Sequence, residues 1–179
     1  MKKIFAILKE LVTSFIIALI LFGLISAFFR IGKVDGISME STYYDGDTVL
    51  IKRRDTTYER GDIVTFIYNE SNENYYIEST ETVYQKAIPN PDMIGEQHIK
   101  RVVGIPGDHI VITDSKLYVN DEFVSESNTY IVDQDYYLAE DEYFVQGDNL
   151  DHSFDSRHHG PIKADQIYGS IFVMEKVFE

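Results

Sequence analysis

The sequence predicts one N-terminal membrane-spanning helix followed by a compact all-β domain. Two observations lead to this fold class. Residues 11–29 form a run of 19 residues without a charged side chain, and the rest of the 179-residue chain breaks into short segments rich in Val, Ile, Tyr and Phe. These segments are bounded by Gly-Asp, Asn-Asp and Pro-Gly pairs, which mark turns between strands. The length allows one modest globular domain in addition to the helix.

The uncharged run, Leu11 to Phe29, is long enough to cross a bilayer. At about 1.5 Å per residue, a helix of this length covers roughly 28 Å, close to the thickness of the hydrocarbon core. Basic residues flank the run on both sides, so the positive-inside rule favours one orientation only slightly. Together with the very short N-terminal tail, this slight bias favours a cytoplasmic N-terminus. We expect residues 1–10 to be a cytoplasmic tail, residues 11–30 the single span of the plasma membrane, and residues 31–179 an extracytoplasmic domain.

A cleaved secretory signal and a buried core helix are the alternatives for this segment. Basic residues before an apolar stretch are typical of a secretory signal. However, the run is longer than the usual signal core of about 7 to 15 residues, and Phe28-Phe29-Arg30 is a poor small-residue cleavage site. A retained anchor is therefore the favoured interpretation.

Charge is divided unevenly along the chain. Residues 34–179 hold 11 of the 16 Lys and Arg residues and 29 of the 30 acidic residues, a net charge of −18. Such an acidic domain opposes nucleic acid and anionic lipid headgroups, so no nucleic-acid partner is expected. The chain has no cysteine, which excludes disulfides and thiolate metal sites. His152, His158 and His159 lack the spacing of a metal site, so neither a metal nor another cofactor is expected.

Short apolar runs predict the strands of the domain, and little after residue 33 supports a helix. The predicted strands lie near residues 47–53, 62–68, 98–104, 109–113, 116–119, 142–146 and 169–177. The stretch Val119-Asn120-Asp121-Glu122 is typical of a tight hairpin turn, because Asn and Asp tolerate left-handed backbone conformations. Residues 69–97 and 124–141 do not fit this pattern. The first stretch is long for a connection and is predicted to be an excursion from the β core, functional, mobile or carrying a small hairpin.

Ser38 is the first candidate catalytic residue. It follows Gly36, which lets the backbone bend, and precedes the apolar Met39. A serine hydroxyl is a weak nucleophile and must give its proton to a nearby base. Taken alone, a serine in this setting is more often an ordinary turn residue, so its assignment depends on a partner elsewhere in the chain.

Lys100 is the candidate partner. In a strand, Ile99, Arg101 and Val103 share one face, and Lys100 and Val102 share the other. Burial among apolar groups can lower the pKa of a lysine from about 10.4 to about 5 to 6 in extreme cases, leaving a neutral amine that can accept the proton of Ser38. The alternative is an exposed lysine in an ordinary edge strand, because lysine is seldom buried.

The chain resembles the type I signal peptidases, which are membrane-anchored serine/lysine proteases, and its compact size and single anchor are similar to the Gram-positive enzymes. The resemblance covers nearly the whole chain from Leu11 and rests on four blocks in the order that the family shows. The blocks are Val34-Asp35-Gly36 with Ser38-Met39, Gly61-Asp62-Ile63-Val64, Ile99-Lys100-Arg101-Val102-Val103-Gly104 with Pro106-Gly107-Asp108, and Gly147-Asp148-Asn149 through Ser153-Phe154-Asp155-Ser156-Arg157. The resemblance implies a compact antiparallel β-sheet domain that varies most in length around residues 69–97.

The resemblance also implies the catalytic roles. Ser38 would be the nucleophile and Lys100 the general base of a Ser/Lys dyad that cleaves signal peptides from secreted preproteins. The backbone N–H of Ser38 would stabilise the oxyanion, because Gly36 stands where some members carry a serine. His98 is a competing base, since eukaryotic relatives use histidine; with Lys100 present, it would line the substrate groove or simply be exposed.

Supporting residues are implied in the last block. The serine that matches Ser153 orients the lysine ammonium in the family, and the residues that match Asp155 and Arg157 form an ion pair. Gly147 opens this block and belongs to the same supporting group. A neutral buried amine needs fixed hydrogen-bond partners to hold its geometry, so these assignments are physically reasonable.

Preproteins and the lipid bilayer are the expected partners. Ser38 lies eight residues beyond Arg30, at most about 27 Å even in an extended chain, so the active site should lie near the outer membrane surface. An extended substrate could pair with a strand edge there. By resemblance, it would present small residues at the first and third positions before the cut. The candidate pocket residues are Ile37, Met39, His98 and Ile99, although ordinary core positions explain them nearly as well.

Two departures from the family pattern affect the interpretation. Ser41 and Tyr43 replace the usual proline and leucine after Ser-Met, and Leu150 replaces the usual arginine after Gly-Asp-Asn. The first departure puts the substrate preference in doubt, but not the nucleophile. A noncatalytic or specialised pilus or surface-protein assembly factor with this fold therefore remains the alternative function. A self-cleaving regulator is disfavoured, because the chain has an anchor and no DNA-binding segment.

Overall fold

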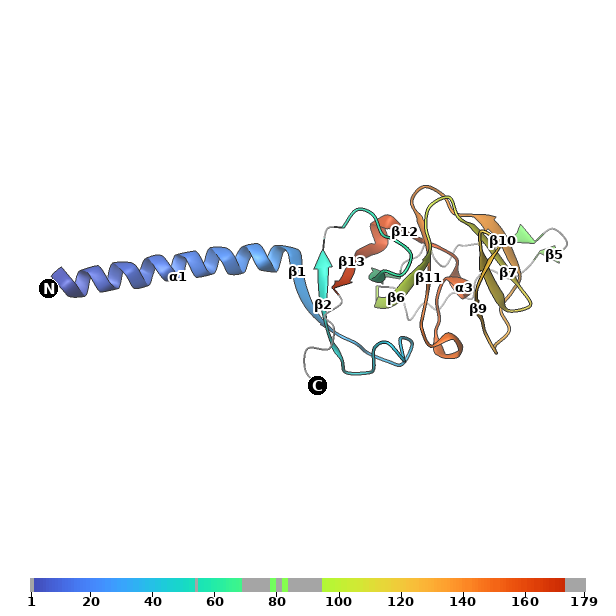
Figure 1. The fold of residues 1–179 in the computed structure, drawn as a ribbon, viewed down its shortest axis with the longest axis horizontal. Helices are drawn as coiled ribbons and strands as arrows, with labels where there is room; N and C mark the ends of the chain where they lie inside the picture. Colours follow the sequence, from blue (N-terminus) through green and yellow to red (C-terminus); the bar gives the residue numbers. More distant parts are fainter. Residues whose placement is uncertain (1, 54, 69–77, 80–81, 84–94, 173–179) are drawn as a thin grey trace.

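The computed structural model describes residues 2–53, 55–68, 78–79, 82–83 and 95–172 (Figure 1). The chain forms one long helix followed by a β-rich domain. In order, its elements are α1 (Lys2–Phe28), β1 (Phe29–Lys33), β2 (Thr48–Arg53), β3 (Ile63–Ile67), β4 (Glu78–Ser79), β5 (Thr82–Val83), β6 (Gln97–Gly104), β7 (His109–Thr113), β8 (Lys116–Val119), β9 (Glu122–Glu126), β10 (Gln134–Tyr137), β11 (Glu142–Gln146), α3 (Ser156–His159), β12 (Ile162–Lys163) and β13 (Ile167–Phe172), with short 3-10 turns at Leu150–His152 and Ala164–Gln166.

Helix α1 extends away from the domain and packs against almost nothing (Figure 1). Its apolar residues surround the whole helix instead of forming one stripe, which is the pattern of a helix that lies in lipid and not on a protein surface. Its length and composition are sufficient to cross a membrane. The helix ends at Phe28 and passes directly into β1, so Arg30, the last residue of the expected span, lies in a strand.

The larger sheet has seven strands in the order β1-β2-β13-β3-β6-β11-β12, and its pairs are antiparallel. Strand β1 forms the edge nearest α1. Alternation along β3 and β6 directs apolar side chains into two clusters, one around Val64, Phe66 and Val102, the other around Met39 and Ile51. The sheet thereby holds β6 in its interior, which is the strand that carries the candidate base.

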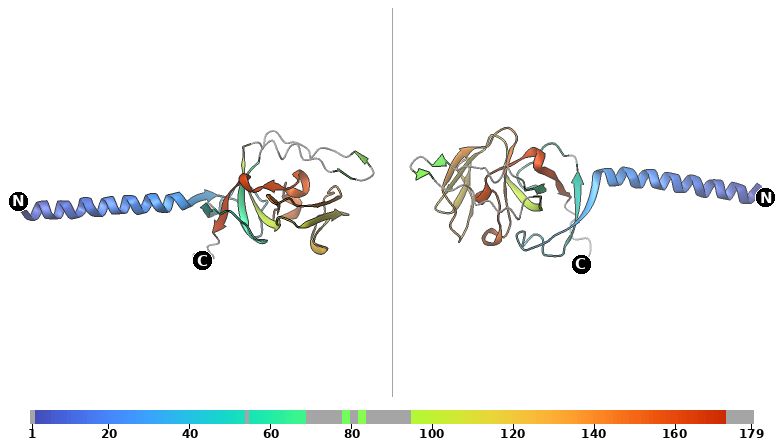
Figure 2. Two further views of the ribbon diagram at one scale, coloured as in Figure 1. Left: turned by 90° about the horizontal axis from the view of Figure 1, so that it is seen from above. Right: turned by 180° about the vertical axis from the view of Figure 1, so that it is seen from behind.

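The smaller sheet has four strands in the order β10-β7-β8-β9 and lies at the end of the domain far from α1 (Figures 1 and 2). Its core contains Ile110, Ile112 and Leu117 and is packed against Phe144 of the larger sheet. Asn120 and Asp121 have positive φ values of 52° and 67° between β8 and β9. The predicted hairpin turn at residues 119–122 is therefore confirmed, because Val119 pairs with Glu122.

The antiparallel all-β domain behind an apolar helix agrees with the prediction. Each of the seven predicted strands coincides with an observed strand within a few residues; residues 173–177 lie outside the described part of the chain. Most of the excursion at 69–97 also lies outside it, although β4 and β5 form a small hairpin there. The expectation of little helix missed the one-turn helix α3, which forms because the Asp155 side chain caps its N-terminus. Strands β1, β9, β10 and β12 were not among the predicted strands.

Candidate active site

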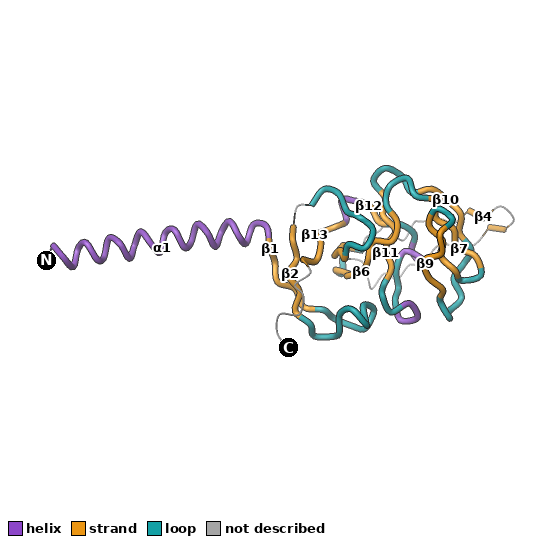
Figure 3. Tube along the Cα trace, viewed as in Figure 1, coloured by secondary structure: helices purple, strands orange, loops and turns teal. Residues whose placement is uncertain are grey.

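A long loop between β1 and β2, residues 34–47, carries Ser38 (teal in Figure 3). Its two ends are tied together by hydrogen bonds from Val34 N to Asp47 O (2.8 Å) and from Gly46 N to Val34 O (2.9 Å). Gly36 has φ +87°, a conformation that a residue with a side chain rarely adopts. Met39 is fully buried in the core, so the residue after Ser38 fixes the loop to the sheet.

Lys100 lies in the middle of β6 and is only 3 % exposed. Its Nζ donates to Ser38 Oγ at 2.8 Å and to the Ile99 carbonyl at 3.0 Å. Burial, and to a smaller extent the positive charge of Arg157, lower the pKa of Lys100 from 10.5 to about 8, against the opposing charges of Asp155 and Asp148. The two residues of the expected dyad are thus in direct contact, and the amine loses its proton more readily than that of an ordinary lysine.

Asp155 and Arg157 form a buried ion pair close enough to Lys100 for both charges to affect its pKa. Arg157 Nε and Nη2 donate to the two carboxylate oxygens of Asp155, each at 2.8 Å, and Gly147 N adds a third bond at 2.9 Å. Burial alone would raise the pKa of Asp155, but these donors hold it below its ordinary value. Arg157 also donates to the Leu150 carbonyl at 2.8 Å, so the pair fixes the shape of the whole loop after β11.

Gly147 lies where this loop passes close to Ser38. A Cβ atom built on it would be 2.2 Å from Ser153 Oγ and 2.6 Å from the Ser38 carbonyl oxygen. Only glycine fits there without moving one of these groups. Ser153 is buried, and among the described residues its Oγ has no hydrogen-bond partner, although it lies near enough to Asp155 to help lower the pKa of that carboxyl group.

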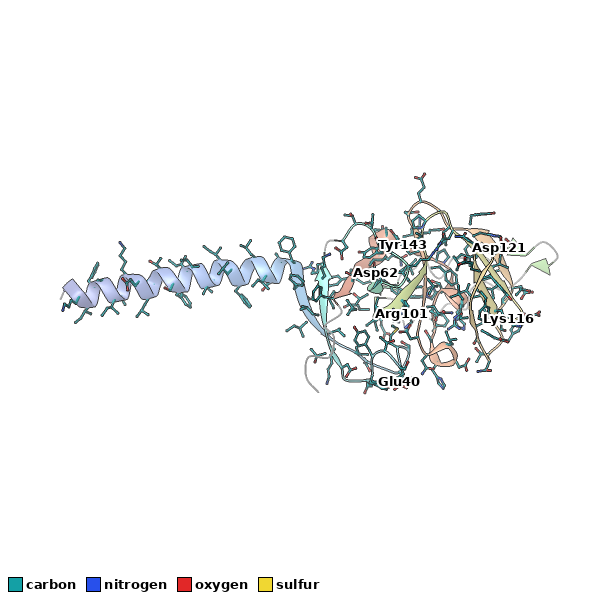
Figure 4. The ribbon with its side chains drawn as sticks, viewed as in Figure 1. Glu40, Asp62, Arg101, Lys116, Asp121 and Tyr143 are labelled. Atoms are coloured by element: carbon teal, nitrogen blue, oxygen red, sulfur yellow. The ribbon has the colours of Figure 1, made fainter. Side chains whose placement is uncertain are left out.

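A second ion pair, not anticipated from the sequence, clamps the nucleophile loop to β6. Arg101 forms two hydrogen bonds to Asp148, from Nε at 2.8 Å and from Nη2 at 2.7 Å, and Thr42 Oγ1 donates to the same carboxylate. Asn149 adds hydrogen bonds to the carbonyls of Ile37 (3.1 Å, from Nδ2) and Ser38 (3.0 Å, from N). Arg101 lies centrally in the domain (Figure 4). The sequence did contain a signal for these contacts, because Arg101, Asp148 and Asn149 lie inside the motif blocks.

A groove of about 230 Å³ opens beside the dyad. Its lining comes from the end of β1 and the following loop, from β2 and β3, and from the first half of β6, and it consists of Gly32, Lys33, Val34, Asp35, Ser38, Val49, Ile51, Thr65, Gln97, His98, Ile99 and Lys100. Of the four candidate pocket residues, His98 and Ile99 line it. Met39 lies in the core, and Ile37 is 44 % exposed outside the lining.

His98 is packed against aromatic rings instead of Ser38. Its ring centroid lies 5.6 Å from that of Phe66 and 6.0 Å from that of Tyr68. Burial, with a contribution from the Lys100 charge, lowers the pKa of His98 to about 4. Its buried Nε2 has no hydrogen-bond partner among the described residues. Lys100 donates a hydrogen bond to Ser38 Oγ and no such bond joins His98 to Ser38 among the described contacts, so His98 is the weaker candidate for the base.

The site therefore combines the Ser38 hydroxyl, a buried amine of lowered pKa and a groove lined by both residues, an arrangement suited to acyl transfer. In the part of the chain that the structure describes, no group of three or more His, Cys, Asp or Glu side chains is placed to hold a metal ion.

Comparisons with known proteins identify the family. A family model described as signal peptidase, peptidase S26, matches residues 7–175. Signal peptidase I V of Bacillus subtilis is 33 % identical over 160 residues, covering 78 % of this chain and 81 % of that protein. The probable signal peptidase I-2 of Synechocystis sp. is 28 % identical over 172 residues, covering 92 % and 70 %. A crystal structure of a signal peptidase I from Enterococcus faecalis aligns with TM-score 0.41 and 26 % identity, covering 64 % and 96 %. The family model, which matches most of the chain, and the relative from Bacillus subtilis show that the chain belongs to the signal peptidase family, peptidase S26.

Proposed function

We propose that Ser38 and Lys100 are the nucleophile and the general base with which this chain cleaves preproteins at the membrane. The family is that of signal peptidase I, so the chain is a serine endopeptidase that removes signal peptides. The observation that supports the dyad is the 2.8 Å contact between Ser38 Oγ and a buried lysine whose pKa is lowered to about 8. These two features make a neutral amine available within proton-transfer distance of the nucleophile.

The proposed reaction begins when Ser38 Oγ–H gives its proton to the neutral Nζ of Lys100 and Oγ attacks the scissile carbonyl carbon. The carbonyl oxygen becomes an oxyanion, for which the backbone N–H of Ser38 is the proposed donor. The Lys100 ammonium then protonates the leaving amine as the C–N bond breaks, which leaves an acyl group on Ser38. Water, deprotonated by Lys100, hydrolyses this ester and restores Ser38.

The other residues of the loop after β11 are proposed to position the dyad. Asp155 and Arg157 form a fixed, charge-neutral pair beneath the amine, and Gly147 allows Ser38 and Ser153 to approach each other. Ser153 is proposed to orient the Lys100 ammonium during the reaction. Its hydroxyl lies in the same buried loop and has no competing hydrogen-bond partner among the described residues.

The substrate is proposed to bind as an extended segment in the groove. Strand β1 is the outer edge of the larger sheet, and β11 pairs with β6 only from Arg101 onward. Both the β1 edge and residues 97–100 line the groove, so main-chain pairing is available on either side of a bound strand. Small side chains at the first and third positions before the cut suit the space beside Ile99.

Helix α1 is proposed to be a retained plasma-membrane anchor with the N-terminus in the cytoplasm. The groove-lining residue Gly32 follows the end of the helix by only four residues. With α1 spanning the bilayer, the groove lies close to the outer surface, where a signal peptide held in the membrane presents its cleavage segment. Residues 31–179 form the extracytoplasmic peptidase domain in this arrangement.

The test is cleavage of a signal-bearing preprotein by the detergent-purified full chain, with the new N-terminus mapped by mass spectrometry. We expect a cut after a small residue that both Ser38→Ala and Lys100→Ala abolish. Lys163→Ala, which removes an exposed lysine far from the groove, should cut as the wild type does. Cleavage at the same site by either dyad variant would refute the mechanism. An inactive but folded wild type would favour the noncatalytic assembly-factor alternative.

A further inference from the structure

One face of the smaller sheet is turned away from its core and carries exposed aromatic side chains. Ile110, Ile112 and Leu117 point into the core. Side chains alternate between the two faces of a strand, so the residues between these positions, and the residues that pair with them, point outward. The outward surface, termed the aromatic face, consists of Asp135 and Tyr137 on β10, His109 and Val111 on β7, Tyr118 on β8 and Phe123 on β9.

The rings of the aromatic face lie next to one another across the strands. Tyr137 stacks on His109, with ring centroids 4.4 Å apart and an angle of 15° between the planes. Tyr118 meets Phe123 edge to face at 5.8 Å. Val111 pairs with Tyr118 and lies two residues from His109 on the same face, so the two ring pairs are neighbours. Tyr137 is 70 % exposed and Phe123 59 %. Contiguous exposed apolar surface that is rimmed by polar groups marks an interaction site.

The surroundings of the aromatic face are strongly acidic. Residues 105–141, which include all four strands of the smaller sheet, hold nine acidic residues and a single basic one, Lys116. Glu126 already engages Lys116. In contrast, Asp121, Glu122 and Asp133 are exposed and have no salt-bridge partner in the part of the chain that the structure describes. Such a surface attracts cationic groups and repels anionic ones.

We propose that the aromatic face binds a lysine- or arginine-rich segment of a partner protein. A cationic side chain is attracted to the face of an aromatic ring. Asp135, whose side chain is 74 % exposed, supplies a carboxylate on the same surface as the rings. A second copy of this chain would bring the same negative charge to the contact, and anionic lipids or glycans would be repelled, so the charge favours a basic segment.

The aromatic face is separate from the candidate active site. The smaller sheet lies at the end of the domain far from α1 (Figures 1 and 2). None of the six residues of the aromatic face is among the residues that line the groove. Binding at this face is therefore a property of the domain that does not depend on the proposed cleavage reaction.

The test is the binding of fluorescein-labelled octalysine to the detergent-purified full chain, followed by fluorescence anisotropy at low and at physiological ionic strength. We expect saturable binding that weakens as salt is added, because exposed charges are screened. Tyr137→Leu combined with Phe123→Leu removes two exposed rings but keeps apolar side chains at both positions. This double variant should bind octalysine roughly five- to thirtyfold more weakly, which corresponds to the loss of two exposed cation–π contacts.

Tyr130→Leu is the matched control, because Tyr130 is 82 % exposed in the connection between β9 and β10 and is not part of the aromatic face. Its affinity for octalysine should equal that of the wild type, and circular dichroism checks that all variants keep the fold.

Equal affinity of the wild type and the double variant would show that octalysine is held only by the general negative charge of the domain, and it would overturn the inference. Binding of the neutral sugar chitohexaose instead of octalysine, lost in the double variant, would assign the aromatic face to a glycan and overturn it as well. So would self-association of the wild type without octalysine binding, measured by sedimentation equilibrium and lost in the double variant, because the occupant would then be a second copy.

Discussion

The two sheets of this domain differ in whether they bury charged side chains. The larger sheet and the loop after β11 bury Lys100, Asp155 and Arg157 almost completely. The smaller sheet has an apolar core, and its ion pairs lie at the rim, where Lys116 and Glu126 approach to 3.8 Å with both side chains solvated. Lys116 is also placed at the far end of the domain (Figure 4). Burying an ionic group costs several kcal/mol unless it is well paired, so the larger sheet accepts an energetic cost that the smaller one avoids.

This difference indicates that the smaller sheet supports the charged loop after β11. Gln134 of β10 donates to the Arg157 carbonyl at 2.7 Å, and Gln146 of β11 donates to Ser125 of β9 at 2.8 Å. Asp151, in the loop after β11, accepts a hydrogen bond from Asn128 N at 2.8 Å. Hydrogen bonds with uncharged groups of the smaller sheet and of the segment after β9 therefore hold the charged loop and limit the positions that it can take.

Lys100→Met should produce the largest change, with opposite signs for activity and stability. Preprotein cleavage should fall by at least roughly 10³-fold, because the proposed base is lost. The folded-state pKa of about 8 lies below the unfolded value of 10.5, so the penalty for charging the buried amine is fully present below pH 8 and disappears as the pH rises to 10.5. Replacing the amine should raise the free energy of unfolding by about 3 kcal/mol at neutral pH. Urea unfolding followed by circular dichroism in detergent measures this, and an unchanged or lower stability would contradict it.

Asp155→Asn should destabilise the fold strongly, because it leaves Arg157 charged, buried and without its carboxylate partner. Breaking a buried pair in this way costs about 3 to 5 kcal/mol. The same urea experiment tests it. Asp135→Asn, which affects the exposed carboxylate paired with His109 on the smaller sheet, is the control and should change stability by less than about 0.5 kcal/mol. Similar losses of unfolding free energy in both variants would contradict the proposed difference between the buried ion pair of the larger sheet and the exposed pair of the smaller one.

The pH dependence of cleavage should follow Lys100. The reaction needs the neutral amine, so kcat/KM should rise with pH through an apparent pKa near 8 and then level off. The negative charge of Asp148 raises the pKa of Lys100, so Asp148→Asn should shift this rise to lower pH. His109→Gln on the smaller sheet should leave it in place. A profile that is flat between pH 6 and 9, within about a factor of two, would exclude Lys100 as the titrating base.

Lys116→Gln should have the smallest effect. The pair with Glu126 is long and solvated, and exposed pairs of this kind contribute about 0 to 1 kcal/mol. We expect a change below about 0.5 kcal/mol in the free energy of unfolding and no change in cleavage. A loss above about 1 kcal/mol would show that the rim charges of the smaller sheet contribute more than their exposure suggests.

Local patterns in the sequence were sufficient where each element contains its own signal. Strands β7, β8 and β11 match the predicted ranges because short apolar runs and Asn, Asp and Gly turns bound them. Strand β10, with the sequence Gln-Asp-Tyr-Tyr, has no such run; it is a strand because it pairs with β7, and distant pairing is not visible in a local window. Strand β1 was hidden because its apolar residues continue those of the anchor.

For the candidate site, too, local sequence identified the residues but not the contacts between them. Ser38 and Lys100 were identified from the sequence because each lies in a recognisable block. That they touch depends on the register between β6 and β3 and on the anchoring of the loop at residues 34–47, neither of which any single block encodes. The pair Arg101 and Asp148 shows the same limit, since its members are 47 residues apart and meet only through the fold. Met39 shows that position beside a nucleophile does not imply a place in the pocket.

Because α1 passes directly into β1, the distance between the end of the helix and the groove is fixed. Because strand follows helix without an intervening loop, the wall of the groove is a continuation of the anchor itself. In the proposed membrane arrangement, Ser38 acts at a fixed distance from the bilayer surface. The proposal therefore implies that cleavage depends on the distance of a peptide bond from the lipid as well as on the side chains around it, so that an identical sequence placed nearer or farther is not cut.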